Sequence, residues 1–156
     1  MDTITDYTGR KKDISIFQYP DATVVGAQDV SVGFGKSGRF CAGVQKTAQR
    51  YAIILLTNVT SQPAYPTFGT SFMYTLQGGI SPVDQIYARQ IFTLANYKAV
   101  MTLREYQSTR TDIPEDEQLA NATLNNLSLY GGYVAFDVKI DTAAGGSIDF
   151  LVPLPK

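Results

Sequence analysis

Paired carboxylates are the catalytic groups that this sequence could supply. Glycoside hydrolysis needs one acid that protonates the leaving group and a second that supports the sugar cation or activates water. The candidates are Glu105 and the run Glu115, Asp116 and Glu117. Pro114 precedes that run, however, and proline followed by acidic residues is typical of a helix start, where the helix dipole favours negative charge. We therefore expect these acids to be structural and not catalytic.

Other catalytic chemistries lack their usual residues. The chain contains no histidine, which removes the commonest general base, the Ser-His-Asp and Cys-His arrangements and the imidazole ligands of zinc. Cys41 is the single cysteine, and without a neighbouring base we expect a small, semi-buried apolar residue. Gly33 lies too close to Gly35-Lys36-Ser37 for a phosphate loop, so we expect a flexible turn there. The sequence predicts no enzyme, no cofactor and no metal.

Charge and hydropathy narrow the possible partners. Thirteen basic and fourteen acidic residues give a net charge of −1, which argues against a protein that neutralises many phosphates. The charge runs at residues 10–12 and 115–117 are expected to be solvated turns. No stretch approaches the roughly 18 apolar residues of a membrane span. We expect a protein made in a reducing cytoplasm, with neither nucleic acid nor membrane as its partner.

The chain has the usual length of one domain. Its first part is expected to be irregular. Residues 1–42 are predicted to be an N-terminal arm with one or two short strands, and residues 43–156 an α+β domain. Apolar residues with helical spacing predict an amphipathic helix that begins at residue 44 and ends near residue 57. Its apolar stripe contains Val44, Ala48, Tyr51, Ala52 and Leu55.

A second, longer helix is predicted after a proline-rich loop at residues 60–70 and a short helical turn at residues 71–76. Ser81 is suited to cap this helix and Pro82 to occupy its first position. The helix is expected to run to about residue 105. One apolar face is predicted to contain Val83, Ile86, Tyr87, Ile91, Leu94, Ala95 and Met101.

The last third of the chain changes to an apolar period of two, which predicts half-buried strands. The alternating apolar residues are Val134, Phe136, Val138 and Ile140 in one strand and Ile148, Phe150, Val152 and Leu154 in the next. Pairing Ile140 with Ile148 across the turn at residues 142–146 puts both sets on one face. The same register pairs Val138 with Phe150 and Phe136 with Val152.

The strand before this hairpin follows the same parity. A two-residue turn at Gly131-Gly132 pairs Leu129 with Val134, and Leu127 with Phe136. The result is an antiparallel meander of three to four strands whose apolar face two helices can cover.

The last strand is predicted to lie at an edge of the sheet, because Pro153 cannot donate to a ladder. An open edge can accept a strand from another chain. Residues 123–130 form the alternative edge. The candidate partner-binding residues are Ser147, Ile148, Asp149, Phe150, Leu151 and Val152.

Three short motifs occur in a fixed order before the long helix and the terminal hairpin. They are Gly43-Val44-Gln45-Lys46-Thr47-Ala48-Gln49-Arg50, then Leu55-Leu56-Thr57, then Pro66-Thr67-Phe68-Gly69-Thr70. This order and spacing resembles the baseplate-wedge family of contractile-tailed phages, which includes the tail sheath initiator. The resemblance covers roughly residues 43–155. The family often shows Glu-Pro-Arg after its long helix, where this chain has Glu105-Tyr106-Gln107, so only Glu105 is implied as a wedge contact.

The resemblance implies a structural virion protein of the tail baseplate, assembled in the host cytoplasm. Such a subunit surrounds the tube in several copies and presents a sheet edge to which the first sheath ring adds strands. Its partners would be the tail sheath protein, other wedge proteins and tube or hub proteins. Two alternatives remain: a carboxylate-dependent cell-wall glycosidase, because some relatives carry a lysozyme description, and another tail connector or terminator. A glycosidase needs two carboxyl groups in one groove, whereas the assembly role needs an accessible strand edge.

Overall fold

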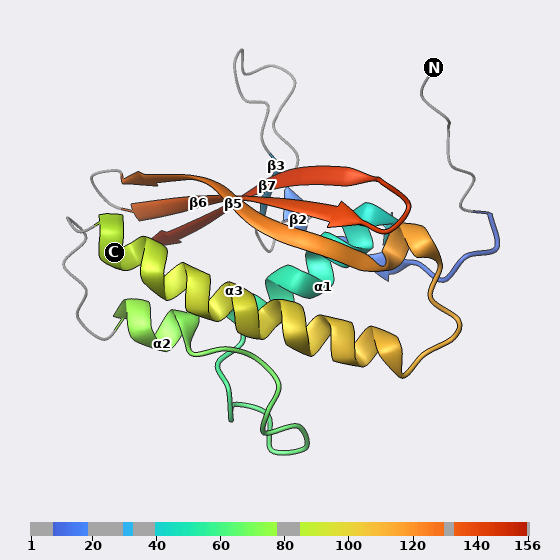
Figure 1. Cartoon of the computed structure of the whole chain (residues 1–156), viewed down its shortest axis with the longest axis horizontal. Helices are drawn as coiled ribbons and strands as arrows, with labels where there is room; N and C mark the ends of the chain where they lie inside the picture. The colour runs from blue at the N-terminus through green and yellow to red at the C-terminus, as the bar shows by residue number, and fades with distance from the viewer. Residues whose placement is uncertain (1–7, 19–29, 33–39, 78–84, 130–132, 156) are drawn as a thin grey trace, which may run out of the picture.

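The computed structural model describes residues 8–18, 30–32, 40–77, 85–129 and 133–155. It has the predicted α+β architecture, in which helices lie against one face of a β-sheet (Figure 1). Among the helices in these ranges, none combines the length and the hydropathy needed to cross a lipid bilayer.

The C-terminal third forms the predicted antiparallel meander. Its strands are β5 (Leu119–Leu129), β6 (Tyr133–Thr142) and β7 (Ser147–Pro155). The predicted register is confirmed: the pairs include Ile140 with Ile148, Val138 with Phe150, Phe136 with Val152, Leu127 with Phe136 and Leu129 with Val134. The β6–β7 turn closes through a 2.8 Å hydrogen bond from the Thr142 amide to the Gly146 carbonyl. The predicted Gly131-Gly132 turn lies outside the described residues.

Three helices accompany the sheet: α1 (Val44–Leu56), α2 (Phe72–Gln77) and α3 (Gln85–Ser108). The predicted stripe of α1 is largely confirmed, with Tyr51 and Leu55 fully buried, and the helix ends where Thr57 turns into extended backbone. The short helix at residues 71–76 is also confirmed. The predicted cap by Ser81 and Pro82 lies outside the described part of the chain.

The predicted apolar face of α3 is mostly wrong. Among the described members of that set only Ile91 and Ala95 are buried, whereas Ile86 and Leu94 are 72% and 75% exposed. Val83 lies outside the described residues. The buried face instead contains Ala88, Ile91, Phe92, Ala95, Ala99, Leu103 and Gln107. The helix carries two apolar stripes, and the one with three alanines faces inward because small side chains let the helix axis approach its neighbours closely.

Aromatic rings form the centre of the core. Phe72 of α2 meets Phe92 of α3 with ring centroids 5.9 Å apart, and Phe136 of β6 lies 5.2 Å from Phe72 and 5.4 Å from Phe92. Tyr51 of α1 makes an edge contact with Phe150 of β7 at 6.3 Å. These rings join all three helices to the meander, and edge-to-face pairs add to the stability from burial alone.

In the described ranges, the N-terminal segment contributes four short strands. They are β1 (Asp13–Ile14), β2 (Phe17–Gln18), β3 (Val30–Val32) and β4 (Phe40–Cys41). β1 pairs with β4, while β2 and β3 join the meander in a five-stranded sheet of order β2-β3-β7-β6-β5. The sheet is therefore wider than the predicted three to four strands, because part of the predicted arm belongs to it.

Phe136→Ala is expected to lower the free energy of unfolding by about 3 to 5 kcal/mol, since it leaves a cavity where three rings meet. Urea denaturation followed by circular dichroism measures this change. Leu94→Ala is the control: the residue is 75% exposed, so its cost should stay within about 0.5 kcal/mol. Equal effects of the two variants would contradict this account of the core.

Candidate functional site

The predicted partner-binding edge at Ser147, Ile148, Asp149, Phe150, Leu151 and Val152 is not an edge of the sheet. β3 runs parallel to β7 and pairs with it at Phe150 and Leu151, and β6 occupies the other side. Pro153 lacks a donor at its own position only, so β7 can still accept β3 two residues earlier. The edge prediction failed because nothing local to β7 reveals a partner strand more than 100 residues away.

β5 forms the outer edge on the other side of the sheet, and in the described ranges no strand pairs with its outer side. Side chains of α3 cover its first half. Three contacts do so: Gln107 accepts from the Leu119 amide, Arg104 donates to the Ala120 carbonyl and Asn96 donates to the Ala122 carbonyl. Side chains that satisfy edge backbone groups are one way to protect a sheet from unwanted pairing.

The second half of β5, residues 123–129, has a different character. Each half of β5 contains a register shift: the first, between Leu119 and Asn121, leaves Ala120 as an extra residue, and the second, between Leu124 and Asn126, leaves Asn125, which makes a β-bulge. The Leu127 amide donates to the Asn126 side chain at 2.9 Å, so one amide in this half already has a side-chain partner. Thr123, Asn125 and Asn126 are exposed. We call residues 123–129 the open edge.

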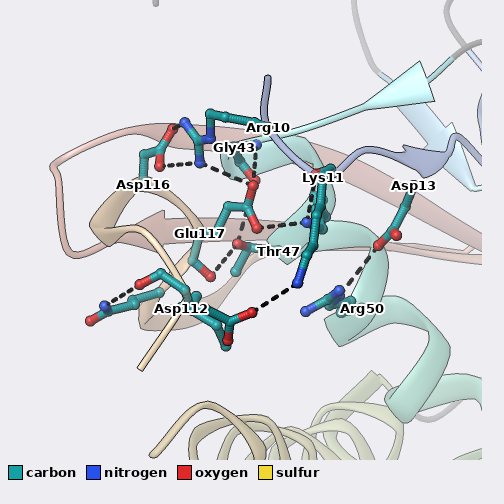
Figure 2. A network of polar contacts seen from close by, with 12 residues as sticks. Arg10, Lys11, Asp13, Gly43, Thr47, Arg50, Asp112, Asp116 and Glu117 are labelled. Carbon is teal, nitrogen blue, oxygen red and sulfur yellow. Dashed lines mark hydrogen bonds and ion pairs between the residues drawn. The ribbon is translucent and has the colours of Figure 1, made fainter. Parts of the chain in front are cut away.

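A buried carboxylate, Glu117, joins the N-terminal segment to α1 (Figure 2). It ends η1 (Glu115–Glu117), a short 3-10 helix at the predicted helix start, where Pro114 is the extended N-cap and not the first helical residue. The side chain of Glu117 is 5% exposed and contacts the Lys46 Nζ at 2.8 Å and the Arg10 guanidinium at 3.0 Å. Lys46 is equally buried, at 6%. The two charges can be buried because each has the other as a partner.

The backbone of Glu117 ties two further elements together. Its carbonyl accepts hydrogen bonds from the Thr47 hydroxyl and from the side-chain Nε2 of Gln107, each at 2.7 Å. The same Gln107 accepts from the Leu119 amide, so one side chain links the end of α3 to the start of β5. Glu117 thus fixes α1, α3 and β5 relative to one another.

Of the two charge runs expected to be solvated turns, Lys11, Lys12 and Glu115 are exposed, whereas Arg10 joins the runs through Asp116 and Glu117. Arg10 binds Asp116 with two hydrogen bonds of 2.7 Å, and Lys11 contacts Asp112 at 3.1 Å. The hydrogen bond from Arg10 lowers the pKa of Asp116 below its ordinary value, because it favours the charged carboxylate. The presence of one basic and one acidic run is the signal in the sequence that could have suggested the contact of Arg10 with Asp116.

The remaining candidate acids lie on the surface. Glu105 is exposed near the end of α3, where its carbonyl accepts from the Ser108 hydroxyl, and Glu115 is exposed on η1. Of the four candidate carboxylates, the structure therefore holds Asp116 and Glu117 in ion pairs with cations and places the other two at the surface. Within the described ranges, no group of three metal-ligating side chains comes together.

Cys41 is buried, as expected, and its thiol donates to the Gln49 side chain at 3.5 Å. Burial is the main cause that raises the pKa of the Cys41 thiol to about 11. The thiol is therefore protonated at neutral pH and unreactive as a nucleophile.

Two of the motifs noted in the sequence form one structural unit. The Thr70 amide donates to the Thr57 carbonyl at 2.8 Å, and the Thr70 hydroxyl donates to the Leu55 carbonyl at 2.6 Å. Gly69 adopts φ +100, and a Cβ at this position would collide with the Thr57 carbonyl oxygen. Only glycine fits there, which gives a physical reason for the Gly-Thr pair at this distance from the end of α1.

Comparison with known proteins finds no matching family model, no matching curated protein and no matching solved structure.

Glu117→Gln is expected to destabilise the fold by about 3 to 5 kcal/mol, because it leaves the buried Lys46 ammonium without its charge partner. Combining it with Lys46→Met should cost much less than the sum of the two single changes. Urea denaturation of the four proteins gives the coupling energy. Glu115→Gln on the exposed side of η1 is the control, with an expected effect within about 0.5 kcal/mol. Additive single effects would mean that the ion pair does not hold these elements together.

Proposed function

We propose that this protein is a structural subunit of a contractile phage tail baseplate and that it initiates the sheath. Its open edge, residues 123–129 of β5, accepts a strand from a subunit of the first sheath ring. The observation that carries this proposal is the unequal protection of the long edge strand, whose first half is covered by α3 and whose second half is not paired by any described strand.

The length of the open edge suits a short donor strand. β5 has 11 residues, and the covered residues 119–122 leave a stretch comparable to an ordinary strand of about five or six residues. Main-chain hydrogen bonds supply the affinity in this mode of recognition, so charged side chains are not needed. The exposed Thr123, Asn125 and Asn126 agree with that requirement.

The bulge at Asn125 adds selectivity to the open edge. Bulges twist an edge strand and discourage indiscriminate pairing between sheets of identical molecules. A donor strand must therefore follow the local twist of β5, which favours a specific partner over self-association.

The motif resemblance supports the same assignment. Leu-Leu-Thr and Phe-Gly-Thr contact each other directly, so their order and separation follow from a packing requirement and not from chance composition. In this assignment the subunit is present in several copies around the tube, and exposed Glu105 faces a neighbouring wedge protein.

Deletion of the gene for this chain is expected to yield tail tubes without an assembled sheath, because the first sheath ring loses its template. Negative-stain electron microscopy of lysates detects the difference, and supply of the intact chain in trans should restore sheathed tails. Complete sheaths on particles that lack the chain would rule out an initiator.

Strand addition at the open edge is tested by photo-crosslinking within assembled particles. Thr123→Cys, labelled with a benzophenone maleimide, should crosslink to the sheath protein, because a side chain on β5 lies beside its neighbour on the added strand. The native Cys41 does not interfere, since it is buried and its pKa is raised to about 11.

Thr93→Cys on the exposed surface of α3 is the matched control and should give no sheath crosslink. Sheathed particles in which the position 123 probe captures no sheath peptide would refute docking at β5.

A further inference from the structure

A basic pocket of about 250 Å3 lies between the N-terminal segment, the start of α1 and the residues that follow α3. Its lining contains Gly9, Arg10, Lys11, Lys46, Arg50, Arg110, Asp112, Ile113, Pro114 and Glu117. Five of the thirteen basic residues of the chain thus meet at one place, although the whole chain has a net charge of −1. Asp112 and Glu117 lie in the same lining, and Asp13 and Asp116 pair with two of its cations. Five positive and four negative groups leave a small excess of positive charge, which favours an anion.

Four of these cations already have carboxylate partners. Lys46, Arg10 and Lys11 contact Glu117, Asp116 and Asp112. Arg50 differs, because Asp13 accepts a hydrogen bond from its Nε at 3.3 Å and no described contact uses its two terminal nitrogens. Arg110 has no carboxylate within ion-pair distance in the described ranges. Arg50 and Arg110 therefore supply the unused donors of the pocket.

Tyr106 holds both of these arginines. The Arg50 guanidinium lies 5.5 Å from the centroid of the Tyr106 ring, and the Arg110 guanidinium lies 4.5 Å from it. Contact with an aromatic ring orients a guanidinium without using its hydrogen-bond donors. The terminal N–H groups of both guanidinium ions thus stay available for a carboxylate, which arginine can bind through two parallel hydrogen bonds.

An apolar pocket of about 190 Å3 adjoins the basic one and shares Arg50 with it. Ile53 and Ile54 of α1, Phe68 of the loop, and Leu103 and Tyr106 of α3 line most of it. Ile53 is 40% exposed, so the apolar lining reaches the surface. Both pockets are smaller than the roughly 300 Å3 at which sites begin to hold drug-sized ligands, so each suits a single chemical group.

We propose that the paired pockets bind a segment of a partner protein in which a large apolar side chain lies next to an acidic one. The apolar side chain enters the pocket beside Ile53 and Leu103, and the carboxylate binds Arg50 and Arg110. A free phosphate or another simple anion would contact the arginines but would leave the apolar pocket empty. Charge complementarity and the shared residue Arg50 together select an acidic and apolar peptide.

This site is independent of strand addition at β5. It lies on α1, the end of α3 and the N-terminal segment, and its test uses the purified protein without sheath or baseplate. A failure here leaves the initiator proposal standing, and the reverse also holds.

Titration of the 15N-labelled protein with two capped peptides, Ser-Leu-Glu-Ser and Ser-Leu-Gln-Ser, tests the proposal by NMR. The glutamate peptide should shift the Arg50 and Arg110 Nε–H resonances and the Ile53 amide along saturable curves. The glutamine peptide should bind at least about tenfold more weakly, because it cannot form charge-assisted hydrogen bonds. Absence of saturable shifts with the glutamate peptide would overturn the proposal.

Two further experiments distinguish this site from one that binds any anion. Capped Ser-Ala-Glu-Ser and inorganic phosphate should also bind at least about tenfold more weakly, and equal binding by either would refute the role of the apolar pocket. Arg110→Gln should abolish the shifts, whereas Arg89→Gln, the same change on the exposed surface of α3, should leave them intact. Undiminished binding to the Arg110 variant would equally contradict the proposal.

Discussion

A carboxylate removed from water is the constraint on which this structure depends. Glu117 lies almost fully buried, and an unpaired charge in that position would cost several kcal/mol. Its partners come from two segments far away in the chain, Lys46 in α1 and Arg10 before the first strand. Arg10 therefore couples the N-terminal segment to the folded domain through this buried charge. β5 begins two residues later, so the same ion pairs fix where the edge strand starts.

The polar residues on the buried side of α3 follow from the same geometry. A helix that packs across the start of an edge strand faces unpaired backbone groups there, and apolar side chains could not satisfy them. Gln107 and Asn96 do so from the helix side, and Tyr51 fixes the orientation of Asn96 through a hydrogen bond of 2.5 Å. The Ala122 carbonyl is the last backbone group of β5 that these two side chains contact. The boundary between the covered and the open part of β5 is therefore set by the path of α3 across the sheet.

The extent to which sequence predicted this fold depends on the range of the interactions. Strand alternation is a local pattern, and one correct pair, Ile140 with Ile148, determines every other pair of its hairpin, so the register could be derived. The insertion of β3 beside β7 and the contact of Arg10 with Asp116, 106 residues apart, have no local signature. The face of α3 was mispredicted because two apolar stripes satisfy the same periodicity, and only packing distance distinguishes alanines from Ile86 and Leu94. The open edge was foreseen only as the alternative, since the proline in β7 was a stronger local signal than anything in β5.

The end of α3 connects the two surfaces that we assign to partners. Tyr106 and Gln107 are consecutive residues that point in different directions: the first holds Arg50 and Arg110 beside the basic pocket, and the second bonds Glu117 and the start of β5. A shift of this helix end would therefore move the arginines and the covered part of the edge together. Both surfaces need a fixed backbone, because strand addition depends on ladder register and guanidinium recognition depends on planar geometry. The Glu117 carbonyl bonds Gln107 at this helix end, so the buried ion pair holds the point that both surfaces share.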